Sequence, residues 1–217
     1  MLVKQWRWYP GTGWSDPTIP IQGCHLVLAF GTRARLEDPD LQHILEVLRG
    51  PAPLVACAAV NDSDSGGTIG QGLVVTAVRF GRSQVRVAVG MAGAADSVTE
   101  GQQMAAQLDG PDLRHLFVFT DGPRDHRSEL VRGLRSGLTG GEAIPGGLVC
   151  AGSDFEPSWV MANDRVGPEL AVAIGLFGAA VPAGEGNPDG WAALGPRHQI
   201  SAAHDSVLRE LDGADGA

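Results

Sequence analysis

Lysine is almost absent from this 217-residue chain: Lys4 is the only one, and the other basic side chains are scattered arginines. The 16 basic residues are outnumbered by 25 acidic ones, which gives a formal net charge of -9. Nucleic acids and anionic membranes both favour a basic protein surface. The charge balance therefore argues against nonspecific binding to either, and we expect no nucleic-acid partner and no membrane partner.

Long apolar runs are missing as well. No run approaches the roughly 20 residues that a membrane-spanning helix needs, and the N-terminus lacks the apolar core of a signal peptide. Cysteine is scarce, since Cys24, Cys57 and Cys150 lie far apart, each in or beside an apolar run. This pattern is typical of buried free thiols in a reducing compartment. We therefore expect a cytoplasmic protein.

Motifs of common active sites and metal sites are also missing. No lysine follows the glycines in the way a phosphate loop requires, and neither a Gly-x-Ser-x-Gly elbow nor a His-Glu-x-x-His pair occurs. Residues 61–67 begin like a calcium loop, but the twelfth position counted from Asp62 is Leu73, where a bidentate Glu is needed. Cysteines and histidines lack zinc-finger spacing. We therefore expect no metal site and no enzyme.

The residues that are present predict alternating strands and helices. Apolar runs at 25–30, 54–60 and 115–120 predict buried strands. Three helices are predicted: one from the Asp38-Pro39 start over 41–48, one from the capping-box pattern of 97–100 to about 108, and one over 130–138. Residues 73–80 and 84–89 flank a short turn and predict a hairpin.

After residue 144 the helical pattern fades. Apolar segments separated by glycine-rich turns predict strands at 147–150, 158–162, 170–177 and 199–203. No internal sequence repeat is visible. We predict an α/β (mixed α+β) fold: a largely mixed β-sheet with about three covering helices in the first two-thirds and a strand-rich C-terminal third. Residues 1–22 are expected to form an extended aromatic arm, and residues 23–217 a single domain.

The order of short segments along the chain carries a family resemblance. These segments are Gly13-Trp14-Ser15, the apolar run to Gly31, Gly72 to Phe80, Phe117 to Gly122, Ser128 to Leu134, Gly146-Gly147-Leu148, Ala171 to Gly178, Gly190-Trp191, Gly195-Pro196-Arg197 and Leu208 to Gly213. Together they resemble the N-terminal domain of the FIST family, over nearly the whole chain. The C-terminal FIST domain that usually accompanies it is not in this sequence.

The resemblance implies a non-catalytic intracellular sensory domain of signal transduction that binds a small ligand, with an amino acid as the suggested ligand. It also implies a signalling protein or a second FIST-type domain as partner, and no established catalytic residues. Some family members are haem proteins that sense nitric oxide, so haem is an alternative to our expectation of no cofactor. A further alternative is a degenerate FIST half that acts in protein interaction or self-assembly as a homo-oligomer. A cysteine-dependent enzyme is the least favoured alternative.

Three family segments are altered here. The stretch usually close to Gly-Cys-Ser-Thr-x-Gly-Glu reads Ala56 to Asp62 and keeps its cysteine, Cys57. The segment after Gly122 reads Pro-Arg-Asp-His-Arg, and the glycine-rich run that starts at Gly146 and Gly147 continues to Asp154. A ligand site that uses these positions is therefore expected to be altered or lost.

Seven residues are the candidates for ligand binding, and each has a simpler structural interpretation. Asp121 either holds a ligand amine or caps the turn after a buried strand. Arg124, like Arg127, either clamps a carboxylate or is solvated. Cys57 is either a small core residue or a reactive thiol. Gly146 and Gly147 are candidates in the altered glycine run. Trp191 either stacks on a ligand or plugs the end of the sheet. Arg197 either holds a returning loop or faces the ligand.

Overall fold

The structure is a computed structural model. It describes residues 1–16, 23–58, 62–64, 67–70, 72–93, 96–120, 124–139, 146–148, 159–167, 169–178, 195–204 and 207–215. Contacts divide the chain into two compact units, Met1–Ala183 and Gly184–Ala217, which are described separately. The predicted boundary near residue 22 stays a prediction.

Unit 1 contains a seven-stranded mixed sheet with the order β12-β11-β4-β3-β7-β1-β2. Its strands β3 and β4 are parallel, whereas β7 pairs antiparallel with both β3 and β1. Two helices, α1 (Arg33–Leu36) and α2 (Pro39–Arg49), connect β3 to β4. The strands are β1 Leu2–Tyr9, β2 Gly13–Trp14, β3 Leu26–Gly31, β4 Leu54–Ala58, β7 Leu73–Arg79, β11 Val160–Ala162 and β12 Arg165–Gly167.

A second sheet of unit 1 has four strands in the order β10-β9-β13-β8. Here β9 and β10 are parallel and are connected by helix α4 (Arg124–Gly137), while β13 pairs antiparallel with β9 and β8. Helix α3 (Ser97–Leu108) connects β8 to β9. The strands are β8 Gln84–Met91, β9 Leu113–Thr120, β10 Gly146–Leu148 and β13 Leu170–Phe177, and a separate pair consists of β5 Asp62–Asp64 and β6 Gly67–Gly70.

The predicted hairpin of residues 73–80 and 84–89 is wrong, although both strands form. β7 pairs with β1 and β3, and β8 pairs with β13 in the other sheet. The turn at 81–83 therefore carries the chain from one sheet to the other. Both strands are apolar enough to be buried in a sheet, and longer-range pairing decides which neighbours they take.

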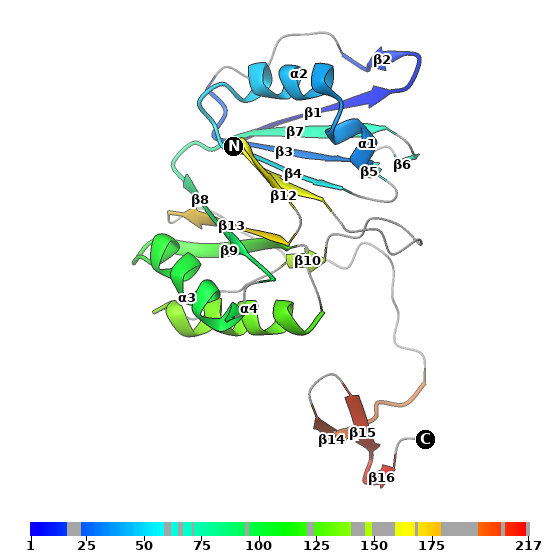
Figure 1. Cartoon of the computed structure of the whole chain (residues 1–217), viewed down its shortest axis with the longest axis vertical. Coiled ribbons are helices and arrows are strands. Elements are labelled where there is room, and N and C mark those ends of the chain that lie inside the picture. Colours follow the sequence, from blue (N-terminus) through cyan, green and yellow to red (C-terminus); the bar gives the residue numbers. More distant parts are fainter. Residues whose placement is uncertain are drawn as a thin grey trace. The chain divides into compact units, whose positions relative to one another are not determined.

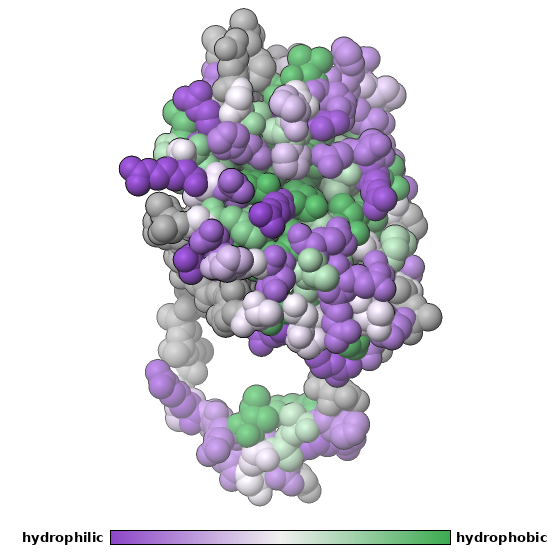
Figure 2. Space-filling model, turned by 90° about the vertical axis from the view of Figure 1, so that its left-hand side faces the viewer, coloured by the Kyte–Doolittle hydropathy of each residue, from purple (hydrophilic) through white to green (hydrophobic). Residues whose placement is uncertain are grey.

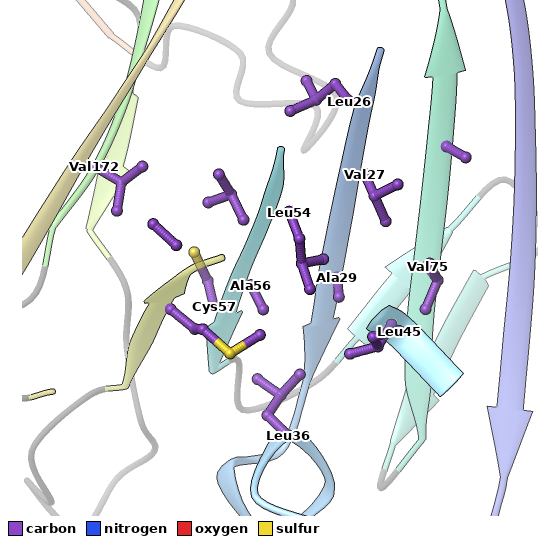
Figure 3. Packing of buried hydrophobic residues seen from close by; sticks show 14 of the residues in the cluster. Leu26, Val27, Ala29, Leu36, Leu45, Leu54, Ala56, Cys57, Val75 and Val172 are labelled. Carbon is purple, nitrogen blue, oxygen red and sulfur yellow. The ribbon is translucent and has the colours of Figure 1, made fainter. Parts of the chain in front are cut away.

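The two sheets face each other, and the helices cover their outer sides (Figure 1). The rings of Phe30 on β3 and Phe119 on β9 meet across the sheets with centroids 6.0 Å apart. On the outer side of the first sheet, Leu45 of α2 lies near Val75, whereas Cys57 points toward Val172 of the second sheet (Figure 3). The core of unit 1 thus consists of four layers, helix–sheet–sheet–helix.

The two sheets share one topology. In the first, the order β4-β3-β7-β1 contains a parallel pair, β3 and β4, joined by a helical crossover. In the second, the order β10-β9-β13-β8 contains the equivalent parallel pair, β9 and β10, joined by α4. In both, a strand antiparallel to this pair follows on the same side (β7 or β13), and beyond it a further antiparallel neighbour (β1 or β8). The halves of unit 1 therefore repeat in topology, although the sequence shows no repeat.

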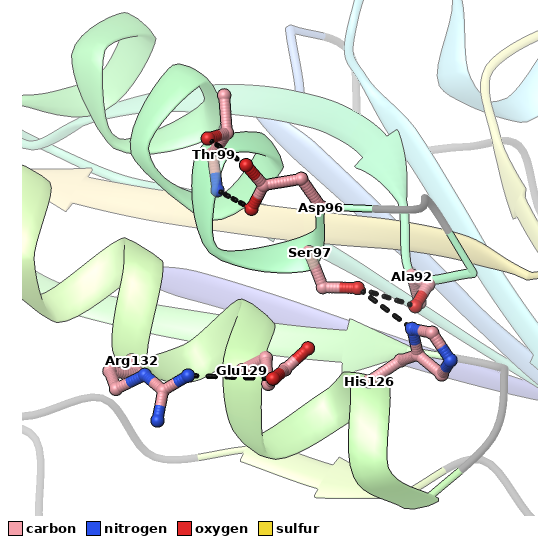
Figure 4. Close-up of polar contacts among 7 residues, drawn as sticks. All are labelled: Ala92, Asp96, Ser97, Thr99, His126, Glu129 and Arg132. Atoms are coloured by element: carbon pink, nitrogen blue, oxygen red, sulfur yellow. Dashed lines mark hydrogen bonds and ion pairs between the residues drawn. The ribbon is translucent and has the colours of Figure 1, made fainter.

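Side-chain caps explain where two helices begin. Asp38 accepts hydrogen bonds from the backbone N–H groups of Asp40 and Leu41, so the predicted start of α2 is confirmed. For α3 the cap is Asp96, which accepts from the N–H and hydroxyl of Thr99 (Figure 4). The capping-box prediction therefore placed the cap one residue late. Glu100, its expected second member, accepts instead from the backbone N–H of Met91.

Unit 2 contains a three-stranded antiparallel sheet of β14 (Ile200–His204), β15 (Val207–Leu211) and β16 (Ala214–Asp215). Its loop is held by Asp212, whose carboxylate accepts from the Gln199 N–H and contacts His198 Nδ1 at 2.6 Å. These two hydrogen bonds, the Gln199 one first, lower the pKa of Asp212. Ile200, Val207 and Leu208 are exposed apolar residues of this sheet.

The predicted α/β fold with mixed sheets and covering helices is confirmed. Residues 2–9, expected in an extended arm, form β1 and pair along their length with β7. No helix in the part of the chain that the structure describes has the length and hydropathy to cross a membrane.

Candidate functional site

The carboxyl ends of four strands meet at one end of unit 1. Phe30, Cys57, Phe119 and Gly147 are each the last residue but one of their strands, which are β3, β4, β9 and β10. The ladders pair Phe30 with Cys57 and Phe119 with Gly147, and the Phe30–Phe119 contact joins the two pairs. Ligands of α/β sheets bind outside the carboxyl ends of parallel strands. This end, called the carboxyl end below, is therefore the first candidate site.

Some of the sequence-predicted residues gather at the carboxyl end. Gly146 and Gly147 lie in β10 beside β9, and Arg124 is the first residue of α4, which follows β9. Asp121 comes directly after Thr120, the last residue of β9, but lies outside the described residues, as does Trp191. Arg197 lies exposed in unit 2. How these side chains would act on a ligand stays a prediction.

Cys57 is part of the core at this end. Its side chain is buried at 3% exposure, and burial raises the pKa of its thiol to about 12. A thiol reacts as its thiolate, which is scarce at neutral pH when the pKa is this high. The environment of Cys57 thus matches its interpretation as a core residue.

A serine and a histidine pair between the first turns of α3 and α4. Ser97 Oγ lies 3.2 Å from His126 Nδ1 and 3.3 Å from the carbonyl oxygen of Ala92, to which it donates (Figure 4). A nucleophilic serine must be reached by its substrate, yet Ser97 is 0% exposed. The pair therefore links the starts of the two helices and the end of β8.

A shallow pocket of about 420 Å³, largely open to solvent, lies at the opposite end of unit 1, where β3, β4 and β8 begin. Figure 2 looks onto this end, with apolar side chains at the centre of the face and polar ones around them. Among the described residues of the lining, none is Asp, Glu, Lys or Arg. The lining consists of Cys24, His25, Pro51, Ala52, Pro53, Ser83, Gln84 and Val85.

Hydrogen bonds hold two of the polar side chains of this pocket, His25 and Cys24. The backbone N–H of Phe80 donates to His25 Nδ1 over 3.1 Å, and the two rings stack with centroids 6.4 Å apart. A neutral His25 therefore carries its proton on Nε2. Cys24 Sγ lies 3.5 Å from the carbonyl oxygen of Arg49, the last residue of α2, and burial raises the pKa of this thiol.

Sequence reasoning missed this pocket. Cys24 was noted as a free thiol, but Pro51 and Ser83 come from segments that are far apart in the sequence. Each segment looks like an ordinary turn or strand start, so no local motif marks them. The folding of both sheets brings them together.

His126, His198 and His204 are not placed as haem ligands. A haem needs an axial ligand inside an apolar pocket. His126 is engaged with Ser97, His198 with Asp212, and His204 lies on the exposed strand β14. Within the described ranges, no group of three or more His, Cys, Asp or Glu is arranged to hold a metal ion.

The described part of unit 1 is thus a four-layer α/β domain with a pocket of ligand size at one end. Residues 25–214 match the family model of the FIST N domain, so the chain belongs to the FIST family. This is a family of signal-transduction sensory domains. No curated protein matches the chain.

Proposed function

We propose that this chain is a non-catalytic, cytoplasmic sensory domain that binds a small molecule in the pocket lined by Cys24, His25 and Ser83. The observation that carries the proposal is the pocket of about 420 Å³ between segments of the two sheets. Small-molecule sites have volumes of about 300–1,000 Å³, mostly apolar walls and a few polar groups that fix orientation. The described lining has this composition: its apolar part comes from two prolines, Ala52 and Val85, and its polar groups include His25, Ser83 and Gln84.

The lining also supports a proposal for the chemistry of the ligand. Because none of the described lining side chains is charged, an ionised ligand would lose its hydration without gaining a partner among them. His25 offers an Nε2–H donor, and the Gln84 amide offers both a donor and an acceptor. The ligand proposed for this pocket is therefore an uncharged molecule with an apolar body and at least one hydrogen-bond acceptor.

The suggested amino-acid ligand would need different surroundings. Its ammonium and carboxylate groups call for partners such as Asp121 and Arg124, which belong to the carboxyl end in sequence order. An amino acid is therefore proposed for the carboxyl end, and the uncharged ligand for the pocket. The buried positions of Cys57 and Ser97 support a non-catalytic role.

A thermal-shift screen tests the proposal with uncharged heteroaromatic compounds and, separately, the amino acids. A ligand at about 100-fold over its Kd stabilises by about 2.7 kcal/mol, which for a chain of this size raises the Tm by about 5–10 °C. The pocket-filling variant Ser83→Trp should abolish the shift. Arg82→Trp is the matched control, because Arg82 is the exposed neighbour outside the lining and should leave the shift unchanged. Equal shifts in both variants would place the ligand elsewhere.

A further inference from the structure

Strand β8 forms one edge of the four-stranded sheet. Its described neighbours are β13 on one side and α3 over one face. Its eight residues, Gln84 to Met91, include no proline and one charged side chain, Arg86. Long apolar edges of this kind pair with other strands unless something blocks them.

Two hydrogen bonds show which backbone groups point away from β13. The N–H of Ala92 donates to the Glu169 carbonyl oxygen, just before β13, so it points toward that strand. The N–H of Met91 donates to the Glu100 carboxylate, so it points away. Backbone direction alternates along a strand. The N–H and C=O groups of Val85, Val87 and Val89 therefore point outward, and within the described residues they form no backbone hydrogen bond to another strand on that side.

The free stretch has defined ends. At Met91 the Glu100 carboxylate already occupies the outward N–H, which stops pairing there. At the other end β8 begins at Gln84, directly after the turn that leads from β7. The side chains of Val85, Val87 and Val89 pack against the core between the sheets but are only half-buried. The edge thus offers the backbone N–H and C=O groups of three residues for pairing, and the apolar side chains of the same residues remain partly exposed to water.

The other half of the fold shows that this position accepts a strand. In the shared topology β1 is the counterpart of β8, and β1 carries β2 on the side away from β7. The pairing joins Trp8 to Trp14 and Tyr9 to Gly13. β8 has no such neighbour among the described strands.

We propose that β8 pairs with β8 of a second copy of this chain, antiparallel about a two-fold axis at Val87. In this register Val87 faces Val87 of the second copy and Val85 faces Val89. These are the outward-pointing residues, so each pair exchanges both N–H···O bonds. The two four-stranded sheets then become one continuous sheet. The edge of β8 is complementary to itself in this pairing, as a two-fold interface requires.

Charge favours a second copy over an unrelated strand. Exposed Arg82 and Arg86 lie at the start of β8, whereas the carboxyl groups of Asp96, Glu100 and Glu169 belong to residues around its end. Antiparallel pairing places each basic start beside the acidic end of the other copy. Arg86 faces Ala88 of the second copy, so no like charges stand directly opposite.

The pairing also brings the second copy to the pocket. Ser83, Gln84 and Val85 line the pocket and begin the edge. In the proposed register Ser83 faces Met91 of the second copy, whose side chain is 44% exposed in one chain. Assembly does not depend on the proposed ligand, so a failed ligand screen leaves this inference intact.

The test is light scattering of the full chain after size exclusion, with a proline scan of the edge. Wild type should have twice the mass of one chain. Val87→Pro should be folded by circular dichroism and monomeric, because Pro removes an outward N–H and leaves the β13 ladder complete. Ala88→Pro, whose N–H points to β13, should fail to fold. A monomeric wild type at high concentration, a dimeric Val87→Pro, or an unfolded Val87→Pro overturns the proposal.

A disulfide trap tests the register independently of folding effects. Val87→Cys should cross-link two copies under mild oxidation, because facing residues of an antiparallel pair have Cα atoms about 5.5 Å apart, within disulfide range. Val166→Cys on β12 is the control, since Val166 is 52% exposed and lies away from β8. It should give no more cross-linked dimer than wild type. Equal cross-linking at both positions contradicts the pairing.

Discussion

The ring of Phe30 lies 6.0 Å from the ring of Phe119 at an interplanar angle of 56°, and this contact joins the two sheets at their carboxyl ends. Phe30 lies near the end of β3, the first strand of one β-α-β unit, and Phe119 lies near the end of β9, the first strand of the other. Both rings are only partly buried. The contact therefore stabilises the arrangement of the halves and also forms a wall of the carboxyl end.

Replacing either ring should destabilise unit 1. We expect Phe30→Ala and Phe119→Ala each to lower the free energy of unfolding by about 2–4 kcal/mol, slightly less than a fully buried Phe would. The double variant should lose about 0.5–1.5 kcal/mol less than the sum, because tilted aromatic pairs add that much beyond burial. Urea unfolding of the four proteins measures this coupling. Strict additivity would show that the two rings do not interact.

Helices α3 and α4 pack through glycines. A Cβ at Gly133 would lie 2.1 Å from the backbone carbonyl oxygen of Val98, and backbone atoms cannot yield as a flexible side chain does. Gly133→Ala should therefore push the helices apart and cost about 3 kcal/mol, at the upper end for overpacking. Gly81→Ala is the control, because a Cβ there meets nothing within 4 Å. Similar urea midpoints for the two variants would contradict the close packing.

Cys57 should make stability depend on alkaline pH. Burial raises the pKa of its thiol from the ordinary 9.0 to about 12, so between these values the unfolded thiol ionises while the folded one stays protonated. The unfolded state then binds fewer protons, and stability falls by about 1.4 kcal/mol per pH unit as the pH rises through this window. Cys57→Ala should lack this part of the decline. If the stability of wild type and of Cys57→Ala fell in parallel with pH, the Cys57 thiol would not be the cause of the decline.

Asp96 should matter for the start of α3. Its carboxylate accepts from the hydroxyl and N–H of Thr99, and these bonds lower its pKa. The stability that these two bonds add is fully present when the pH is above 3.8, the ordinary pKa of this carboxyl group. It is lost as the pH falls through the lower pKa of the folded state. Asp96→Ala should lower the urea midpoint at neutral pH. Asp96→Asn should have a midpoint close to that of wild type. In acid the difference between Asp96→Ala and wild type should become smaller. An unchanged midpoint in Asp96→Ala would show that the cap is dispensable.

The sequence predicts most elements of this fold because the strands are continuous apolar runs and the helices have apolar stripes. It fails where pairing is decided at long range: 73–80 and 84–89 look like a hairpin, yet they pair in different sheets. The cap of α3 was misplaced because Asp96 and Ser97 are both good caps. At the site, strand order brings Cys57 and Gly147 to one end, whereas the pocket around His25 depends on turns that carry no pattern of their own.

The central claim is that a small uncharged molecule binds in the pocket at the amino-terminal ends of β3, β4 and β8. Chemical-shift mapping of the labelled full chain with a hit from the thermal-shift screen tests it most directly. The account predicts that the largest amide shifts fall on His25, Ser83, Gln84 and Val85. Largest shifts at Val118, Phe119 and Gly147, at the opposite end, would contradict it.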